Sequence, residues 1–181
     1  ELDPNNPLLF YNLGSLYKSI LDINKAEKYF KKSLDLNPNY IFAFNNLFDL
    51  YDRSNQLEKY GELLEKAKKN LTEEDLIGFY SGTHEYKKKN YQGAIKFLEN
   101  INLSDSYHVQ NIAKHLILAK SYDHIKNFDK AFYFFKTNND LAKNYYGKNI
   151  DEKIFITYVN QRIKFFENFK IINWKQHSIK N

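Results

Sequence analysis

The sequence contains no cysteine and no methionine, and glycine and proline are scarce. Without cysteine it can form neither a disulfide framework nor a thiolate metal site. The six glycines are scattered, so no glycine-rich loop is present that could bind phosphate through its backbone. No apolar run approaches the roughly 20 residues that span a bilayer, and no signal-peptide pattern opens the chain. We therefore expect a soluble, cytoplasmic protein with no membrane partner.

Arginine is almost absent as well, because only Arg53 and Arg162 are found among 27 basic residues. The net charge is +5, and the excess lies in residues 91–181, which hold 14 basic and 8 acidic side chains. Phosphate-binding surfaces favour arginine, whose planar group grips phosphate through two hydrogen bonds. We interpret most of the basic charge as solvated helix surface in a chain rich in Lys and Asn, and we expect no nucleic-acid partner.

The residue types that support catalysis or metal binding are not grouped. Two histidines four residues apart on one helix would suit a metal, but no such pair occurs. Asp123 and His124 are adjacent, so on a helix their side chains point about 100° apart and make a poor acid/base couple. We therefore expect no catalytic residue, no metal and no cofactor in this chain. The histidines considered are His84, His108, His115, His124 and His177.

A pattern with a period near 34 residues runs through most of the chain, and small residues mark it. Ala26, Tyr60, Ala94 and Ala131 are separated by 34, 34 and 37 residues, and three of the four are alanine. A large apolar residue follows each of them four positions later, as Phe30, Leu64, Leu98 and Phe135. Internal repeats of this length indicate a stack of similar units.

Each repeat contains two stretches with apolar residues at helical spacing, joined by a short polar turn. The turns read "LDIN", "DRSN", "KKKN" and "HIKN", and Pro38 closes the first repeat after "LDLN". Thr72 with Asp75 resembles a capping box at the start of the next helix. Gly14 and Gly82 occupy the same position, where a small residue lets a partner side chain rest against the backbone.

These residues resemble the tetratricopeptide repeat. The stretch "FYNLGSLYKSILDINKAEKYFKKSLDLNP" carries the aromatic, Leu, Gly, Tyr, Ala, Phe and Pro series of that family nearly complete. Tyr60, Gly78 and Glu85 depart from the pattern in the second and third repeats. The resemblance implies an all-α fold, a right-handed α-solenoid of helical hairpins with a C-terminal capping helix. The four repeats span about residues 7–40, 41–74, 75–108 and 112–145.

Two further expectations concern the ends of this array. Pro4 in "ELDPNNP" is equivalent to Pro38, so we expect residues 1–6 to be the tail of a preceding repeat. Residues 1–145 would then form the repeat array, and residues 146–181 a capping helix and a linker. The capping helix is expected because a stack of repeats must cover its last apolar face. The linker would lead to a further domain.

The region from Lys130 to Trp174 is similar to the junction that precedes the catalytic domain in bacterial tetratricopeptide-repeat sulfotransferases. That resemblance implies a downstream sulfotransferase domain, and it favours bacterial relatives. The loop that would hold the phosphosulfate donor is not in this sequence. The residues that carry the resemblance are Ala131, Phe132, Asn139, Tyr145, Phe165, Phe166 and Trp174.

Family members bind extended peptides on the concave surface lined by the first helices of successive repeats. By position, the lining is predicted to mix aromatic rings with hydrogen-bonding groups, which suits a peptide backbone. The candidate peptide-binding residues are Tyr11, Phe42, Asn45, Asp49, Arg53, Phe79, Tyr86, Lys120, Asp123 and His124, with Leu8, Ser15, Lys18, Thr83, Lys87 and Leu116 beside them.

The identity of the ligand stays open at this point. Relatives that clamp a C-terminal carboxylate use Lys, Asn or Arg where this chain has Tyr11, Ser15, Leu76 and Tyr80, which disfavours that ligand class. The leading hypothesis is a scaffold that binds a protein or an extended peptide without catalysis of its own. The alternative is an architectural or dimerisation scaffold. A nucleic-acid binder is disfavoured because cations do not recur at a fixed position of the repeat.

Overall fold

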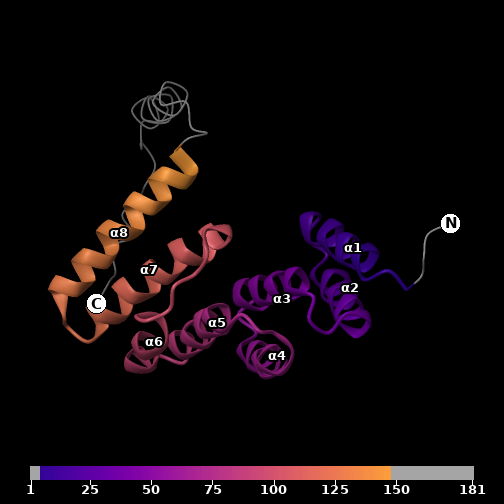
Figure 1. The fold of residues 1–181 in the computed structure, drawn as a ribbon, viewed down its shortest axis with the longest axis horizontal. Coiled ribbons are helices and arrows are strands. Elements are labelled where there is room, and N and C mark those ends of the chain that lie inside the picture. The colour runs from indigo at the N-terminus through magenta and orange to yellow at the C-terminus, as the bar shows by residue number, and fades with distance from the viewer. Residues whose placement is uncertain (1–4, 148–181) are drawn as a thin grey trace, which may run out of the picture. The chain divides into compact units, whose positions relative to one another are not determined.

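The structure is a computed structural model that describes residues 5–147, and it contains helices and no strand within that range (Figure 1). The helices are α1 (Pro7–Ser19), α2 (Ile23–Leu36), α3 (Ile41–Arg53), α4 (Leu57–Asn70), α5 (Glu74–Lys87), α6 (Tyr91–Leu98), η1 (Asp105–Tyr107), α7 (His108–His124) and α8 (Phe128–Tyr146). The chain divides into two compact units between Asn138 and Asn139. None of the helices in the described range is long and apolar enough to cross a membrane.

The helices alternate as first and second members of hairpins, at the period expected from the sequence. We call α1, α3, α5 and α7 the A helices, and α2, α4, α6 and α8 the B helices. Each B helix up to α6 contacts the A helix before it and the A helix after it. This confirms a solenoid of helical hairpins in the first compact unit. The predicted helix near residues 152–174 lies outside the described residues.

The four hairpin turns have one geometry, which explains why they recur in phase. Leu21, Asn55, Lys89 and Lys126 each have a positive φ, between 54° and 63°. The next residue in each turn donates its N–H to a carbonyl five positions back, as Asp22 does to Tyr17 at 2.9 Å. This is the Schellman arrangement, which satisfies the last carbonyls of an A helix and reverses the chain.

Small residues in the A helices make room for the large residues of the B helices, as the sequence predicts. A Cβ added to Gly14 would stand 2.6 Å from Cδ1 of Phe30, and one added to Gly82 would stand 2.4 Å from Cγ of Leu98. Phe30 and Leu98 are fully buried. These two glycines therefore serve close helix packing.

The second hairpin departs from this scheme, because both of its small positions hold large rings. Phe48 replaces the glycine and Tyr60 replaces the alanine, and both are buried. Their ring centroids are 4.8 Å apart, and Tyr80 from α5 stacks on Phe48 at 3.7 Å. Figure 1 shows α3 from the side and α4 nearly end-on. The extra volume is thus accommodated by a steep crossing of α3 and α4 and by a ring from the following repeat.

The third repeat ends differently from the others. Its second helix, α6, is only eight residues long, and the segment that follows contains η1 at Asp105–Tyr107. The three extra residues of this repeat were expected in the same segment. The capping box predicted at Thr72 is wrong. The N-cap of α5 is Glu73, without a side-chain cap, and the Thr72 hydroxyl donates instead to the Glu73 carboxylate at 3.4 Å.

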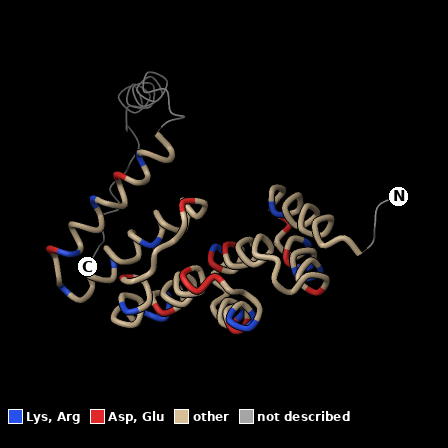
Figure 2. The backbone as a smooth tube through the Cα atoms, in the orientation of Figure 1, with Lys and Arg blue, Asp and Glu red and all other residues tan. Residues whose placement is uncertain are grey.

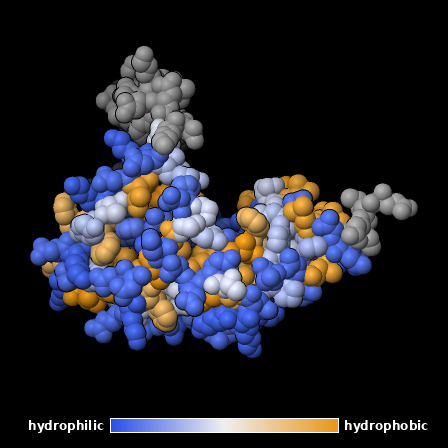
Figure 3. All heavy atoms as spheres, in the orientation of Figure 1, coloured by the Kyte–Doolittle hydropathy of each residue, from blue (hydrophilic) through white to orange (hydrophobic). Residues whose placement is uncertain are grey.

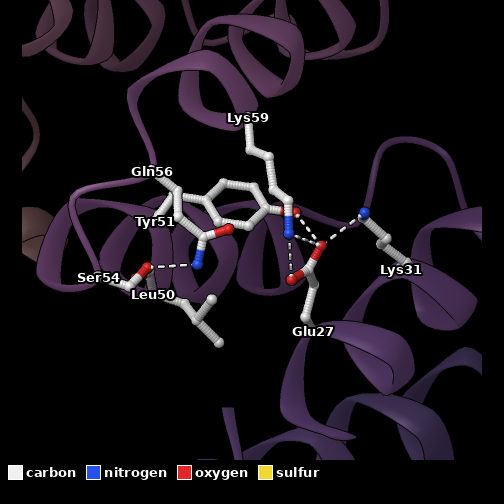
Figure 4. A network of polar contacts seen from close by, with 7 residues as sticks. All are labelled: Glu27, Lys31, Leu50, Tyr51, Ser54, Gln56 and Lys59. Carbon is white, nitrogen blue, oxygen red and sulfur yellow. Dashed lines mark hydrogen bonds and ion pairs between the residues drawn. The ribbon is translucent and has the colours of Figure 1, made fainter. Parts of the chain in front are cut away.

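A buried carboxylate joins the first repeat to the second (Figure 4). Glu27 of α2 is 8% exposed. It accepts hydrogen bonds from the Tyr51 hydroxyl at 3.0 Å, from Lys59 Nζ at 2.9 Å and from Lys31 Nζ at 2.7 Å. Burial alone would raise the pKa of Glu27, but the three donors outweigh it and hold that pKa below its usual value.

Charged residues occur on all eight α-helices of the described range, and α2 and α4, which carry the most, hold both signs, whereas α1 and α6 carry one Lys each (Figure 2). This distribution agrees with the interpretation of the basic charge as solvated helix surface.

Candidate functional site

Three A helices are tied to one another by side chains about one repeat apart. Asn46 of α3 donates to the Tyr11 hydroxyl of α1 at 3.5 Å. The Tyr80 hydroxyl of α5 donates to Asn45 Oδ1 of α3 at 2.6 Å. Each of these contacts spans 35 residues, so the repeat itself sets their register. The side chains predicted to bind a ligand therefore come from helices held at a fixed spacing.

A group of charges connects α1 and α3. Asp49 accepts from Lys18 Nζ at 2.7 Å and from Arg53 Nε at 2.7 Å. Burial would raise the pKa of Asp49, but the hydrogen bonds from Lys18 and Arg53 outweigh it and keep that pKa below its usual value. Asp49 is thus ionised, and each of its carboxylate oxygens already has a partner within the protein. Arg53 binds it through one nitrogen, and the Arg53 side chain is 78% exposed, which leaves the end of its guanidinium group available.

An aromatic cluster lies towards the other end of the same two helices, near the start of α1 and α3. The Tyr11 ring meets Tyr40 edge-on at 5.5 Å and lies 6.2 Å from Phe42. Tyr40 in turn meets Phe42 at 5.6 Å. Phe42 is nevertheless 55% exposed. It is therefore a ring that is fixed on one side and open on the other.

Asn45 and Asn46 are neighbours with different roles. Asn46 is fully engaged, because it accepts from Lys18 Nζ at 2.9 Å and donates to the Phe42 carbonyl at 3.0 Å. Asn45 uses its carboxamide oxygen for Tyr80, so its NH2 group is the part left for a ligand. The sequence reasoning missed Asn46 and Tyr80. Their spacing of about one repeat from Tyr11 and Asn45 was the signal that could have identified them.

The predicted residues of α5 are much less accessible. Phe79 is 6% exposed and belongs to the hydrophobic core. Thr83 is also buried, and its hydroxyl donates to the Phe79 carbonyl at 2.9 Å. Tyr86, one turn further on, is half-buried and lies 5.9 Å from Tyr91 of α6. Phe79 thus packs the interior, and its binding role stays a prediction.

The predicted residues of α7 lie near the other side of Tyr91. His124 stacks on the Tyr91 ring at 4.0 Å, with the two planes only 6° apart. Lys120 and Asp123 are exposed. The structure thus brings Tyr86 and His124 to one tyrosine, and it brings Tyr11, Phe42, Asn45, Asp49 and Arg53 together at α1 and α3. We call this second group the α1–α3 face.

The chemistry of metal binding finds no support in the described part of the chain. Residues 5–147 hold no cluster of three His, Cys, Asp or Glu side chains that could bind an ion. His115 is a helix-face residue whose Nδ1 lies 2.7 Å from the Asn111 carbonyl. Burial lowers the pKa of His115 below its usual value, which keeps it neutral near pH 7.

Comparison with known proteins fits this geometry. Residues 7–40 match the family model of the tetratricopeptide repeat, over the stretch that folds as α1 and α2. Residues 7–40 are thus similar to one unit of that family. The hairpins that follow have the same period and the same order of helices.

Two curated relatives and one solved structure are similar to parts of this chain. Over 90 residues the chain is 33% identical to Photosystem I assembly protein Ycf3 of Rippkaea orientalis, covering 49% of this chain and 47% of that protein. Over 59 residues it is 33% identical to uncharacterized protein ycf37 of Pyropia yezoensis, covering 33% of each. The chain therefore spans about half and about one third of these relatives.

The structure of MamA from residue 41 to its end, from Desulfovibrio magneticus RS-1, matches with a TM-score of 0.58. The match covers 78% of each chain at 16% identity, and it shows the fold alone. Neither curated relative is named as a sulfotransferase, so that link stays a prediction.

Proposed function

We propose that this protein is a non-catalytic scaffold that binds an extended segment of a protein partner on the α1–α3 face. The observation that carries the proposal is that a half-exposed ring, Phe42, and an exposed guanidinium group, Arg53, stand at the two ends of α3, a helix held by side-chain contacts to α1 and α5. A preorganised surface of this kind binds a flexible segment without a further cost of ordering itself.

The side chains favour a particular ligand chemistry. Phe42 and Leu8 are both about half exposed and offer contact area to an apolar side chain. The NH2 group of Asn45 suits a backbone carbonyl, and Arg53 suits a carboxylate. Lys18 is already paired with Asp49, so it contributes less to a ligand. We therefore propose an extended peptide in which an Asp or Glu stands about five residues from an apolar residue, because Phe42 and Arg53 are about three turns apart on α3.

The name of the relative Ycf3 adds a biological setting to this proposal. That protein is described as a photosystem I assembly protein, and a stretch of 90 residues is shared at 33% identity. We propose by analogy that this chain holds a polypeptide during the assembly of a protein complex. The composition of that complex does not follow from the similarity.

A peptide array and two surface variants test the proposal. Phe42→Ala and Arg53→Gln remove the exposed ring and the exposed charge, and both positions are open enough that the fold should survive. Each variant is expected to weaken peptide binding about fivefold to thirtyfold, as for losses of about 1 to 2 kcal/mol at a contact residue. Binding is measured by fluorescence anisotropy with the best peptide of the array.

Matched controls come from the B helices. Phe97→Ala removes another exposed ring and Lys96→Gln another exposed cation, both on α6, and neither should change the affinity. Equal losses in the controls would show a nonspecific effect. Unchanged binding in both Phe42→Ala and Arg53→Gln would refute the site. A molar mass of twice the monomer by light scattering, with no peptide bound, would favour the dimerisation scaffold.

A finer proposal concerns the natural polypeptide. The resemblance of residues 130–174 to the sulfotransferase junction suggests that the scaffold positions a substrate for a downstream sulfotransferase domain. In the described part of this region Ala131 is buried, whereas Phe132 is 73% exposed. Sequencing the gene beyond residue 181 decides the matter. An apolar strand followed by a loop rich in Gly, Arg and Ser would support the proposal, and any other continuation would refute it.

A further inference from the structure

The outer face of α1 has the composition of an interface between repeats, but it is only partly covered. Leu9, Leu13, Leu16 and Tyr17 lie at helical spacing along it, and Leu16 is 57% exposed. In α3 the equivalent positions are Ala43, Leu47, Leu50 and Tyr51, which are at most 2% exposed. Figure 3 shows apolar atoms gathered at the end of the molecule formed by α1 and α2.

The α3 positions are buried next to the B helix of the preceding repeat. α2 contacts α3, and Ala26 and Phe30 of α2 share one core cluster with Leu47 and Tyr51. The same positions in α7 include Leu118 and Tyr122, which are buried where α6 contacts α7. A helix like α2 is therefore the kind of element that the α1 face fits.

A tyrosine and a lysine repeat at these interfaces and hold a glutamate of the docked helix. Tyr51 and Lys59 hold Glu27 of α2. Two repeat intervals further along, Tyr122 and Lys130 hold Glu99 of α6, at 2.7 Å and 2.8 Å. Glu99 stands one helical turn later in its repeat than Glu27 does. In each pair the Lys Nζ also lies near the tyrosine ring, 5.7 Å and 4.8 Å from its centroid.

The interface between α4 and α5 lacks both donors of this arrangement, since Glu85 stands at the tyrosine position and Gly93 at the lysine position. Gly61 stands at the position of Glu27, and Glu65, at the position of Glu99, pairs with Lys68 of its own helix. No glutamate is therefore held by this pair of positions where the two donors are missing. This supports treating the three side chains as one unit, which we call the carboxylate clamp.

α1 has both donors of the carboxylate clamp without a glutamate between them. Tyr17 and Lys25 occupy the tyrosine and lysine positions, and Lys25 Nζ lies 5.0 Å from the Tyr17 centroid. Lys25 bonds instead to Asp22 of its own turn, at 3.1 Å, where both side chains are substantially exposed. Within the described residues the Tyr17 hydroxyl has no hydrogen bond.

We propose that the outer face of α1 docks the second helix of a preceding repeat in the natural polypeptide, and that Tyr17 and Lys25 hold a carboxylate of that helix. The apolar residues supply the buried area, and the carboxylate clamp fixes the register of the docked helix. The site is separate from the α1–α3 face, so it does not depend on the proposed function.

A fusion tests the docking. Residues 7–34 are duplicated directly before Glu1, which keeps the 34-residue period and places a second α2, with its own Glu27, next to α1. Because the chain has no cysteine, Leu16→Cys in the original repeat is a unique thiol probe. Its labelling is expected to be about tenfold or more slower in the fusion than in the chain alone, since a docked helix opens only rarely. Ser19→Cys, outside the face, should label equally in both.

The carboxylate is tested in the same fusion. Glu27→Gln in the duplicated segment, or Lys25→Gln in the original repeat, should speed Leu16→Cys labelling severalfold. No protection in the fusion would overturn the docking, and full protection with both Gln variants would overturn the carboxylate clamp. Protection that grows with the concentration of the unfused chain would make a second copy the occupant. In the natural polypeptide, an upstream helix without an acidic residue equivalent to Glu27 or Glu99 would also overturn the proposal.

Discussion

Replacing Glu27 with glutamine should destabilise the protein, because it removes the only negative charge that three donors share at the junction of the first two repeats. The change keeps the size of the side chain. A glutamine oxygen can still accept one of the hydrogen bonds, but its NH2 group would face the ammonium group of Lys59 or Lys31. The packing against Tyr51 is retained, so the loss reports mainly the electrostatic contribution.

The magnitude follows from the exposure of each donor. Hydrogen bonds to charged groups contribute about 1.5 to 3 kcal/mol when both partners are buried. Here only the Tyr51 residue is buried, at 2% exposed, while the side chains of Lys31 and Lys59 are 50% and 44% exposed. The two lysines can be rehydrated, which reduces their share. We expect a loss of about 1 to 2 kcal/mol in the free energy of unfolding, or about 3 to 6 °C in Tm.

The loss of stability caused by Glu27→Gln should be larger at neutral pH than in acid. The pKa of Glu27 is below its usual value in the folded protein, because its three donors outweigh the effect of burial. Its stabilisation is therefore complete above the unfolded-state pKa and is lost as the pH falls through the lower folded-state pKa. The difference in the free energy of unfolding between the wild type and the variant should reach its full value at about pH 7 and should shrink towards about pH 3.

Urea denaturation followed by circular dichroism measures these differences at each pH. Asp35→Asn is the matched control, since Asp35 is an exposed acidic residue on the same helix and has no ion pair within the described residues. It should change stability by less than about 0.5 kcal/mol. A Glu27→Gln variant as stable as the wild type at neutral pH, or a deficit that persists undiminished in acid, would refute the assignment.

Two further substitutions test the geometry of the repeats. Leu21→Gly should raise the free energy of unfolding by about 0.5 to 1 kcal/mol, because Leu21 has φ 62° and glycine adopts this conformation without steric cost; a thermal melt that shows no gain would contradict the Schellman turn. Gly14→Ala should lower the free energy of unfolding by about 1 to 2 kcal/mol, because the new Cβ would collide with the buried Phe30 ring. The better helix propensity of alanine offsets only part of this loss. A neutral or stabilised Gly14→Ala variant in urea denaturation would show that the ring can move.

The fold could be predicted from the sequence because packing between helices imposes strict limits at a few positions. Ala26, Ala94 and Ala131 are buried where the pattern expects small residues, and Gly14 leaves space for Phe30. Such positions tolerate few residue types, so they recur visibly at the repeat period. Turns recur for the same reason, because a fixed backbone geometry closes each hairpin.

The second repeat shows where this reasoning ends. The sequence indicates that Tyr60 is too large for its position, but it does not indicate what compensates. In the structure Tyr80, 20 residues away, stacks on Phe48 and its carbonyl accepts from the Tyr60 hydroxyl at 3.4 Å. The compensation lies in the next repeat and follows no period, so no alignment of the repeats on one another can reveal it.

The candidate site was predicted by helix position, which specifies the direction of a side chain but not how closely the next helix approaches it. Phe42 and Phe79 were both predicted on the lining, yet one is 55% exposed and the other 6%. The difference arises because α5 also contacts α7, whereas the N-terminal end of α3 leaves one side of Phe42 open. Accessibility is thus a property of the assembled stack.

Pairing of charges within the stack also limits what net charge can say about the ligand. Lys18 is neutralised by Asp49, and Lys87 is paired with Asp52. These lysines contribute to the net charge of +5, but each already has a carboxylate within the protein. A ligand on the α1–α3 face therefore meets mainly Arg53, whose bond to Asp49 uses a single nitrogen. Selectivity for an acidic residue should accordingly depend on this one guanidinium group, and salt should weaken binding far less than a net charge of +5 suggests.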